Sequence, residues 1–570
     1  MAYQDYAEKL ETFAKEEQAR ATDAAAGEKG AVDAASAAGA AEKIGRVVSV
    51  AGSQVIALLE IQDTPAHVKD PSALQIGALV KMRTPETMVF GMVSGLSIPI
   101  PGASPDETEM RIIELELIGE AVDGADDGGI PFRRGVSFCP ALGDGVYATT
   151  QEDLRHVYAQ PDVSSARIGT IYQDQSLPAF VAIDDLLGKH FAILGTTGCG
   201  KSCAVATILR AILSEHSEGH VLLLDLHNEY GHAFSDCAEL LGPTTLNLPY
   251  WLLSFDELRE IVVEPAENRE ADASILKAAV TDAKQEFNDD EDGEGSLFSG
   301  DSPVPYRLSD VVRHIEESLG KLERATDSAP YLRLRDRINT LQVDRRFKFM
   351  FEEGLTIKDT MVDILSLLFR IPADGKPITI LDLSAIPSDI LNVVISMLCR
   401  LTFDFALWAE RDVPMLLVCE EAHRYASQSN DASFESTRRA LSRIAKEGRK
   451  YGVSLCIVSQ RPSELAVGIL SQCNTIFAMR MSNQKDQDFI RGMLSESALG
   501  LMESLPSLRT GEAIGVGEGL SVPVRLCFDL LPENQRPLSG SASFSSAWKE
   551  GDKDKAYVAE IIDRWRRQRR

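Results

Sequence analysis

The segment Gly195–Ser202, with the sequence GTTGCGKS, limits the possible folds of this chain more than any other part of it. It fits the phosphate-loop pattern G-x-x-x-x-G-K-[ST] without a mismatch. An apolar run precedes it, and the helix-like stretch CAVATILRAILSE follows it. Glycines let the backbone curl so that successive N–H groups point at phosphate oxygens, and the positive end of the following helix strengthens that attraction. We therefore predict a nucleotide site, with ATP as its ligand, between a buried strand and a helix.

Each residue of this loop has a predicted role. Lys201 is expected to reach the terminal phosphates, and Ser202 is expected to bind Mg²⁺. Lys189, shortly before the apolar run, is a further candidate for a phosphate contact. The candidate nucleotide-binding residues of the loop and the helix start are Gly195, Thr196, Thr197, Gly198, Cys199, Gly200, Lys201, Ser202 and Cys203.

Six apolar runs recur along the chain, with helix-like stretches such as Ser388–Glu410 between them. Near-continuous apolar runs are typical of parallel strands that are covered on both faces. The pattern predicts a doubly wound α/β core over residues 151–254 and 371–530. The expected strands are residues 191–195, 221–225, 378–383, 415–419, 454–459 and 475–479.

Acidic and amide side chains follow two of these runs, at the sheet edge where parallel α/β proteins bind ligands. Glu420 is expected to support the magnesium ion, at a position where Asp is usual, and Glu421 to polarise the attacking water. Gln460 is expected to sense the terminal phosphate or to orient water. The alternative for the two glutamates is an acidic pair that only caps a helix.

Three more polar residues, Asp225, His227 and Glu229, follow the second expected strand. The two acids are equally compatible with a role in the site and with capping of their own loop. His227 has no paired ligand and is weak evidence for a metal. The loop could instead contact a polymeric substrate.

Basic side chains gather after the acidic strand end. Arg443, Lys446, Arg449 and Lys450 fall within two helical turns. A planar, permanently charged guanidinium suits a phosphoryl transition state, so Arg449 or Arg443 is a candidate arginine finger from a neighbouring subunit. The alternative is a solvated helix face, and spacing alone does not separate the two. Arg480 and Arg491 are weaker candidates.

The region of residues 41–150 has a different pattern, with short β-rich runs between Gly, Pro and Asp turns. Ile113 and Leu115 alternate with Glu114 and Glu116, which is the period of a half-buried strand. We predict a small β-barrel of five or six strands here.

Three further regions flank or interrupt the core. Residues 1–40 are Ala-rich and predict a mobile arm or a frayed helix. Residues 255–370 predict a helical insertion, with an acidic, disordered loop at 286–302. Residues 531–570 predict a Pro/Ser/Gly linker and a basic end, where Trp565 favours docking over free solvation.

The charge balance limits how this chain can bind nucleic acid. Lys plus Arg is 58 against 86 for Asp plus Glu, which gives a net charge of −28. Such a protein does not coat nucleic acid with its whole surface, so DNA binding would need a local basic surface such as a lined channel.

No membrane span and no secretory signal are expected. The 9 Cys contain no CxxC pair and predict reduced thiols in the cytoplasm, without zinc or disulfides.

The motifs AILGTTGCGKS, LLLDLHNEY, LLVCEEAHRY, EGRKYGVSLCIVSQRP and GEAIGVGE…VPVRL, in this order, resemble the HerA family of hexameric DNA translocases, kin to FtsK-type motors. The resemblance covers about residues 43–530. It implies a RecA-like P-loop core, a homo-hexameric ring with ATP and Mg²⁺ between neighbours, and double-stranded DNA in the pore. It also implies the roles given above for Lys201, Ser202, Glu421 and Gln460, with Arg449 or Arg443 acting in trans. Two departures are Glu420 for the usual Asp and Cys199 for the common Ser.

The resemblance further implies a partner: a separately encoded nuclease or other effector docked on the barrel side, in DNA end processing or antiphage defence. An alternative is an ATP-gated hexameric scaffold that assembles and activates an effector without extensive translocation.

Candidate pore cations lie in RLRDRINTLQVDRRFKF, although an ordinary basic helix is slightly favoured for most of them. They are Arg333, Arg335, Arg337, Arg345, Arg346 and Lys348.

Overall fold

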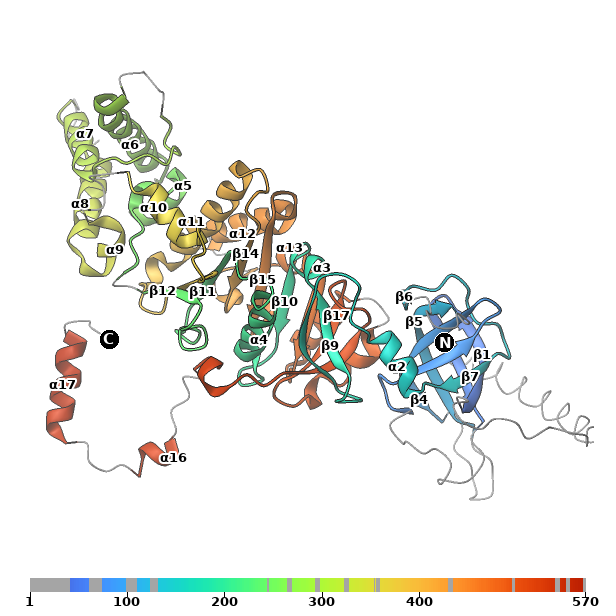
Figure 1. Ribbon diagram of the computed structural model, residues 1–570. Coiled ribbons are helices and arrows are strands. Elements are labelled where there is room, and N and C mark those ends of the chain that lie inside the picture. Colours follow the sequence, from blue (N-terminus) through green and yellow to red (C-terminus); the bar gives the residue numbers. More distant parts are fainter. Residues whose placement is uncertain are drawn as a thin grey trace, which may run out of the picture. The chain divides into compact units, whose positions relative to one another are not determined.

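The computed structural model describes a β-barrel, a large α/β core with a helical insertion, and two C-terminal helices (Figure 1). The described residues are 42–60, 74–98, 110–122, 132–242, 245–263, 269–292, 298–321, 328–352, 354, 359–428, 434–494, 498–538, 544–549 and 554–566. The predicted arm at residues 1–40 lies outside them.

The N-terminal barrel is a closed ring of antiparallel strands, as predicted. The order is β1-β7-β3-β4-β5-β2, and β2 pairs with both β5 and β1 to close the ring, while the short β6 adds to β5. The strands are β1 (Lys43–Ala51), β2 (Gln54–Leu59), β3 (Leu79–Arg83), β4 (Thr87–Ser97), β5 (Ile112–Val122), β6 (Arg133–Arg134) and β7 (Gly145–Ala148). In β5, Ile113 and Leu115 are buried and Glu114 is exposed, but Glu116 is also buried and accepts a hydrogen bond from Ser53.

The core contains an 11-stranded sheet with the order β12-β13-β11-β14-β15-β10-β16-β17-β18-β8-β9. The strands from β12 to β16 are parallel, and the remaining strands extend the sheet antiparallel. All six predicted strands are confirmed: β10 (Phe191–Leu194), β11 (Val221–Asp225), β13 (Ile378–Asp382), β14 (Met415–Cys419), β15 (Val453–Ser459) and β16 (Thr475–Met479). The others are β8 (Ser165–Ile171), β9 (Pro178–Ala182), β12 (Ala238–Leu241), β17 (Glu512–Gly517) and β18 (Val524–Phe528).

The apolar runs form these strands because both faces of the sheet are buried. Alternate residues of one strand enter different hydrophobic clusters. In β14, Leu416 and Val418 pack in one cluster, while Leu417 and Cys419 pack in the other. The side chains of α4 (Lys201–Leu213) belong to the first cluster, and those of α11 (Ser388–Trp408) and α12 (Glu435–Glu447) belong to the second. The predicted doubly wound α/β core is confirmed.

One helix, α11, is long and apolar enough by composition to cross a membrane. However, 67% of that stretch is buried inside the protein, where α11 contacts α5 and α12. Its apolar character is therefore that of a core helix.

The insertion consists of a group of helices (Figure 1), and their buried apolar side chains belong to one hydrophobic cluster. The helices are α5 (Phe255–Val262), α6 (Arg269–Asp292), α7 (Leu308–Gly320), α8 (Ala329–Val343), α9 (Lys348–Phe351) and α10 (Met361–Phe369). The prediction of a disordered loop at 286–302 is wrong for its first part, because α6 continues to Asp292. Glu286 on α6 pairs with Arg313 and His314 of α7, which gives its charge a partner within the helical insertion.

Short helices join the remaining parts. They are α2 (Gln151–Val157), α3 (Ile183–Leu187), α13 (Val467–Leu470), α14 (Gln484–Arg491), α15 (Leu499–Met502), α16 (Phe544–Ala547) and α17 (Lys555–Arg566), with 3₁₀ turns that include η8 (Gly448–Tyr451) and η12 (Glu533–Gln535). No described side chain of α17 is buried, and Trp565 is 78% exposed. The predicted docking of Trp565 is therefore not seen within this chain.

Candidate nucleotide-binding and hydrolysis site

The phosphate loop joins β10 to α4, in the predicted context. Its backbone is tied to the neighbouring strand ends, because Gly195 N donates to Ser459 O at 3.2 Å and Thr196 N donates to Arg480 O at 3.0 Å. Gly200 immediately precedes α4 with φ +102°, a conformation that favours glycine. A Cβ at Gly195 would lie 2.8 Å from Cys199 Sγ, so this position has no room for a side chain either. The loop thus has the curled backbone that phosphate binding needs.

Lys201 and Ser202 start α4 at the base of the loop. Lys201 is 6% exposed, and its Nζ donates to Thr196 O at 3.3 Å, so the ammonium group folds back over the loop. Ser202 Oγ donates to Glu229 Oε2 at 2.7 Å. Cys199 is buried, and its carbonyl accepts from Gly511 N at 2.9 Å. The Cys-for-Ser departure at this position therefore adds a packed apolar side chain, while the backbone makes the hydrogen bond.

Two buried acids follow β14. Glu420 and Glu421 are each 3% exposed. Tyr230 Oη donates to Glu420 Oε2 at 2.9 Å. Burial, together with the neighbouring charge of Glu421, raises the pKa of Glu420 to about 8. Glu420 is therefore an acid that is costly to ionise unless a cation comes close.

Glu421 is linked to the phosphate loop through Gln460. Its backbone is left-handed, with φ +48° and ψ +41°. Gln460 Nε2 donates to Glu421 Oε1, and Gln460 Oε1 accepts from Thr197 Oγ1 of the loop. Glu421 Oε2 is buried without a hydrogen bond from any described residue, although His423 Nδ1 lies 3.3 Å away. Three predicted site residues from three elements thus meet at one point, with a free acceptor on the carboxylate.

The residues present fit a nucleotide with its magnesium ion. Two buried carboxylates lie close together, and the positive charge of Lys201 partly opposes the rise in the pKa of Glu420. Among the described residues, no cluster of three or more His, Cys, Asp or Glu side chains could hold a metal alone. Magnesium typically uses one or two protein ligands together with substrate phosphates. Ser202 and Glu420 are suited to that kind of shared site.

The two acidic residues of the loop after β11 have different roles. Asp225 is fully buried and accepts from the backbone N–H groups of His227 at 3.1 Å and Tyr230 at 3.0 Å, so it holds the loop itself. Burial raises the pKa of Asp225. Glu229 instead reaches Ser202 and belongs to the site.

Arg449 and Arg443 lie far from the phosphate loop of their own chain. Arg449 is on η8, before β15, whereas Gln460 follows β15, and a strand of 7 residues places them on the order of 20 Å apart. Arg449 lines a cavity of about 340 Å³ at the amino ends of β11, β14 and β15. Arg443 lies 3.2 Å from Asp404 and over the ring of Phe403.

Lys189 is also at the wrong end of its strand. It precedes β10, and its Nζ pairs with Asp185 at 3.1 Å and with Glu518. Because β10 runs for 4 residues between Lys189 and the loop, the separation is about 13 Å. The prediction that Lys189 contacts a phosphate in this chain's own pocket is therefore wrong. The weaker candidates are placed differently: Arg480 offers its carbonyl to Thr196, and Arg491 lies 3.6 Å from Asp488.

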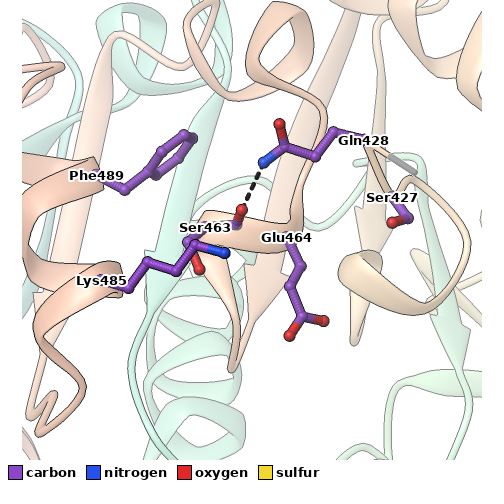
Figure 2. A pocket seen from close by; sticks show the side chains of 6 residues that line it. All are labelled: Ser427, Gln428, Ser463, Glu464, Lys485 and Phe489. Carbon is purple, nitrogen blue, oxygen red and sulfur yellow. Dashed lines mark hydrogen bonds between the residues drawn. The ribbon is translucent and has the colours of Figure 1, made fainter. Parts of the chain in front are cut away.

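A separate surface pocket of about 590 Å³ lies between the segments that follow β14 and β15 (Figure 2). Gln428 crosses it and donates to the carbonyl of Ser463. The lining residues are Ser427, Gln428, Ser463, Glu464, Lys485 and Phe489. None of these residues is among the predicted site residues.

Residues 166–402 match the family model described as the helicase HerA central domain. The chain carries a HerA central domain. This confirms the resemblance inferred from the motifs. Glu420, Glu421, Gln460 and the two arginines lie beyond the matched residues, so their assignment rests on the geometry given above.

Relatives with HerA names match over most of the chain. The DNA double-strand break repair helicase HerA of Pyrococcus furiosus is 26% identical over 515 residues, which is 83% of this chain and 86% of the relative. The protein of the same name from Sulfolobus acidocaldarius is 28% identical over 432 residues, which is 74% of this chain and 80% of the relative.

Solved structures with detectable likeness include VirB4 of Thermoanaerobacter pseudethanolicus, with a TM-score of 0.48, 16% identity and coverage of 66% of this chain and 99% of VirB4. Another is the plasmid coupling protein TrwB in complex with a non-hydrolysable ATP analogue, with a TM-score of 0.44, 13% identity and coverage of 68% and 94%.

Some residues around the site of this HerA-type core have no signal in the local sequence. Tyr230 follows Glu229 directly, but nothing in the motif indicates that its hydroxyl group binds Glu420. His423, two positions after Glu421, faces that acid and Ser459. The segment around Arg536 reaches the loop of Glu229 from the far end of the chain.

Proposed function

We propose that this chain is the subunit of an ATP-dependent double-stranded DNA translocase or helicase. The observation that carries the proposal is the Thr197–Gln460–Glu421 connection, which starts at the phosphate loop of the HerA central domain. It joins the phosphate loop to a buried acid through an amide, which is the arrangement needed to sense a terminal phosphate. The names of the relatives, DNA double-strand break repair helicases, support DNA as the substrate.

The residues of the site have distinct tasks in this proposal. The loop N–H groups and Lys201 bind the phosphates, and Ser202 and Glu420 would hold Mg²⁺. Bound magnesium supplies charge neutralisation at the phosphates. Glu421 accepts a proton from the water that attacks the terminal phosphorus, and the bond to the bridging oxygen breaks to give ADP and phosphate. Gln460 orients Glu421 and the terminal phosphate relative to each other.

The subunits form a homo-hexameric ring in this proposal. Arg449 lies before the amino end of β15, opposite the phosphate loop, and Arg443 lies on the preceding helix α12, so in this proposal either of them completes a neighbour's site. A head-to-tail ring brings one edge of each subunit against the other edge of the next. DNA then passes through the pore, and local basic loops there contact its phosphates while the outer surface stays acidic.

A separately encoded nuclease or other effector is the proposed partner, docked on the barrel side. The barrel is a closed domain of its own, distinct from the sheet that carries the hydrolysis site, so it can bind a partner without blocking ATP. DNA end processing and antiphage defence are the proposed settings.

An ATP-gated hexameric scaffold is the second candidate, and one observation favours it. The candidate pore cations of the insertion are largely engaged within the chain. Arg333 pairs with Asp272, Arg335 with Asp336, Arg346 with Asp344, Lys348 with Glu352, and Arg337 donates to the carbonyl of Ile261. Paired cations contribute less to binding a phosphate backbone, which agrees with the net charge of −28.

Steady-state ATPase measurements with and without long duplex DNA distinguish the two candidates. A translocase is expected to hydrolyse ATP at least about threefold faster with duplex DNA, because each step along DNA is coupled to turnover. Glu421→Gln is the control and should be inactive in both conditions. An ATPase rate that is the same with and without duplex DNA, together with a partner nuclease that is active only when the ring is present, would exclude translocation and support the scaffold.

A further inference from the structure

The chain returns to the nucleotide pocket after its last strand. Residues 529–538, here called the crossing segment, run along α4 and the loop after β11. Thr207 Oγ1 of α4 donates to Asp529 O at 3.3 Å, and Leu538 N donates to Glu229 O at 2.9 Å. The ring of His232 contacts Arg536 O at 3.1 Å. A stretch predicted to be a linker is therefore fixed to the elements that build the site.

Glu229 connects this segment to the phosphate loop. Its backbone carbonyl holds Leu538, and its side-chain carboxylate accepts from Ser202 Oγ at 2.7 Å. The crossing segment is thus one residue away from the serine that follows Lys201. No other part of the described chain beyond residue 528 makes such a contact with the site.

Arg536 is the cation of the crossing segment. Its side chain is half-buried, and its Nε donates to Leu531 O at 2.6 Å, which folds the segment around η12 and leaves the two Nη groups as donors. Arg536 lies two residues before Leu538, whose N–H group donates to Glu229, and seven residues after Asp529, whose carbonyl accepts from Thr207 of α4. Its guanidinium group therefore belongs to a stretch that is held at both ends by elements of the nucleotide pocket.

The direction along the loop gives the part of the nucleotide that Arg536 faces. In a phosphate loop the lysine reaches the β and γ phosphates, while backbone groups cradle the α and β phosphates. The crossing segment contacts α4 at Thr207, six residues after Lys201, and this direction leads away from the terminal phosphate. A guanidinium on this side of the pocket can stack on an adenine ring.

We propose that Arg536 is a nucleotide-binding residue of the same chain, and that it contacts the adenine base and ribose of ATP rather than its phosphates. The crossing segment then forms the outer wall of the pocket. This inference rests on the proposed ATP site and deepens it.

The test compares the affinity for ADP with that for inorganic tripolyphosphate, which has phosphates but no nucleoside. Calorimetry with the full-length protein and Mg²⁺ at fixed ionic strength measures both. Arg536→Ala is expected to weaken ADP binding about tenfold, because the base of ADP loses a stacked guanidinium, and to leave tripolyphosphate binding within about twofold. An unchanged affinity for ADP, or an equal loss for both ligands, would overturn the proposal.

A matched control separates contact from loosening of the segment. Arg167 lies 3.2 Å from Asp529, the first residue of the crossing segment, and is exposed. Arg167→Ala removes an arginine and an ion pair from the same segment without touching the pocket, so both affinities should stay unchanged. If Arg167→Ala weakens ADP binding as much as Arg536→Ala does, the effect comes from the segment's position and the assignment to Arg536 is wrong.

Hydrogen exchange provides a readout that does not depend on any variant. ADP should slow exchange at Leu538 and its neighbours more than tripolyphosphate does, because the nucleoside half would pack against the crossing segment. Equal protection by the two ligands would count against the proposal.

Failure of this inference and failure of the proposed function are distinguishable. Lys201→Ala should abolish binding of both ADP and tripolyphosphate. If it leaves ADP affinity intact, the nucleotide site itself is misassigned and both ideas fall. If Arg536→Ala alone has no effect, this inference falls, and stimulation by duplex DNA still tests the proposed function.

Discussion

Among single residues, Glu421 shows how the local backbone serves the site. A left-handed conformation is unfavourable for a residue with a side chain and persists only where its surroundings hold it. Here the carboxylate is held by Gln460, and the turn η6 (Ala422–Arg424) starts directly after it. The strained position turns the acid toward the phosphate loop instead of letting it follow the strand direction. This supports Glu421, rather than Glu420, as the residue that activates water.

Replacing Glu421 by Gln should separate binding from hydrolysis. The amide keeps the size of the side chain but cannot accept a proton, so ATP affinity should stay within about threefold while kcat falls roughly 100-fold or more. Calorimetry gives the affinity and a phosphate-release assay gives kcat. A variant that still hydrolyses ATP at near the original rate would move the catalytic role away from Glu421.

Removing the hydroxyl group of Tyr230 should weaken the fold without changing its shape. Tyr230→Phe leaves one oxygen of the buried Glu420 without its donor, and such a loss costs about 1–3 kcal/mol. The free energy of unfolding, measured with urea, should fall by that amount. Tyr557→Phe is a control at an exposed tyrosine on α17 and should change little.

These residues also mark the limit of prediction from sequence. Lys201 and Ser202 are predictable because phosphate binding fixes them within one short segment. Glu421 and Gln460 are predictable because acids and amides at strand ends meet at one sheet edge. The Tyr230–Glu420 hydrogen bond joins positions 190 apart, so no local pattern indicates it. The same holds for the contact of Leu538 with Glu229.

Among helices and strands, predictability follows burial. Six of the seven parallel strands are buried on both faces, so their apolar runs stand out, and these six predictions are confirmed. The antiparallel strands β8, β9, β17 and β18 are not individually predicted. Glycines or polar residues interrupt the apolar positions of β8, β17 and β18. The acidic start of residues 286–302 was expected to be disordered from its charge, yet Glu286 has Arg313 and His314 as partners on α7. Charge composition alone does not reveal partners that come from another helix.

A buried ion pair between Glu257 and Arg400 helps to hold the insertion on the core. Glu257 of α5 is 3% exposed, and Arg400 of α11 donates to it at 2.8 Å and also to Leu252 O. Ser396 Oγ also donates to Glu257, at 2.9 Å. Glu257 in addition caps the first turn of its own helix through Ser254. The pair therefore fixes both the start of α5 and its position on α11.

Breaking this pair from one side should cost more than removing it. Arg400→Met leaves Glu257 buried without its cation and should lower the free energy of unfolding by roughly 3–5 kcal/mol. The double variant Glu257→Leu with Arg400→Met should recover part of that loss, since no charge is then stranded. Urea unfolding of the single and double variants measures the difference. Purely additive losses would show that the two side chains do not act as a pair.

For the chain as a whole, the central feature is that the two candidate arginine fingers, Arg449 and Arg443, lie away from the phosphate loop of their own chain. The phosphate loop lies at the carboxyl edge of the sheet, and Arg449 and Arg443 lie toward the amino edge. The sequence predicts both groups but not their separation, because spacing along the chain does not give the direction of each strand. Only the fold shows that these arginines face away from their own ATP site.

Mixed rings test this arrangement directly. Arg449→Ala should bind ATP normally but lose roughly 100-fold or more in kcat, since a trans arginine stabilises the transition state. Lys201→Ala should be inactive because it binds no nucleotide. When the two variants are co-assembled in equal amounts in a head-to-tail ring, about a quarter of the interfaces join an intact loop to an intact arginine, so about a quarter of the activity should return.

The same experiment identifies which arginine acts. Arg443→Ala is run in parallel, because its pairing with Asp404 and stacking on Phe403 give it a structural role within the chain. If Arg449 is the finger, a ring made only of Arg443→Ala subunits keeps most of the activity. A mixture with Lys201→Ala then has no more activity than the Arg443→Ala subunits contribute by themselves. If Arg443 is the finger, the pattern reverses. If neither mixture regains activity although both variants assemble, the site is completed within one chain, and the ring is not required for hydrolysis.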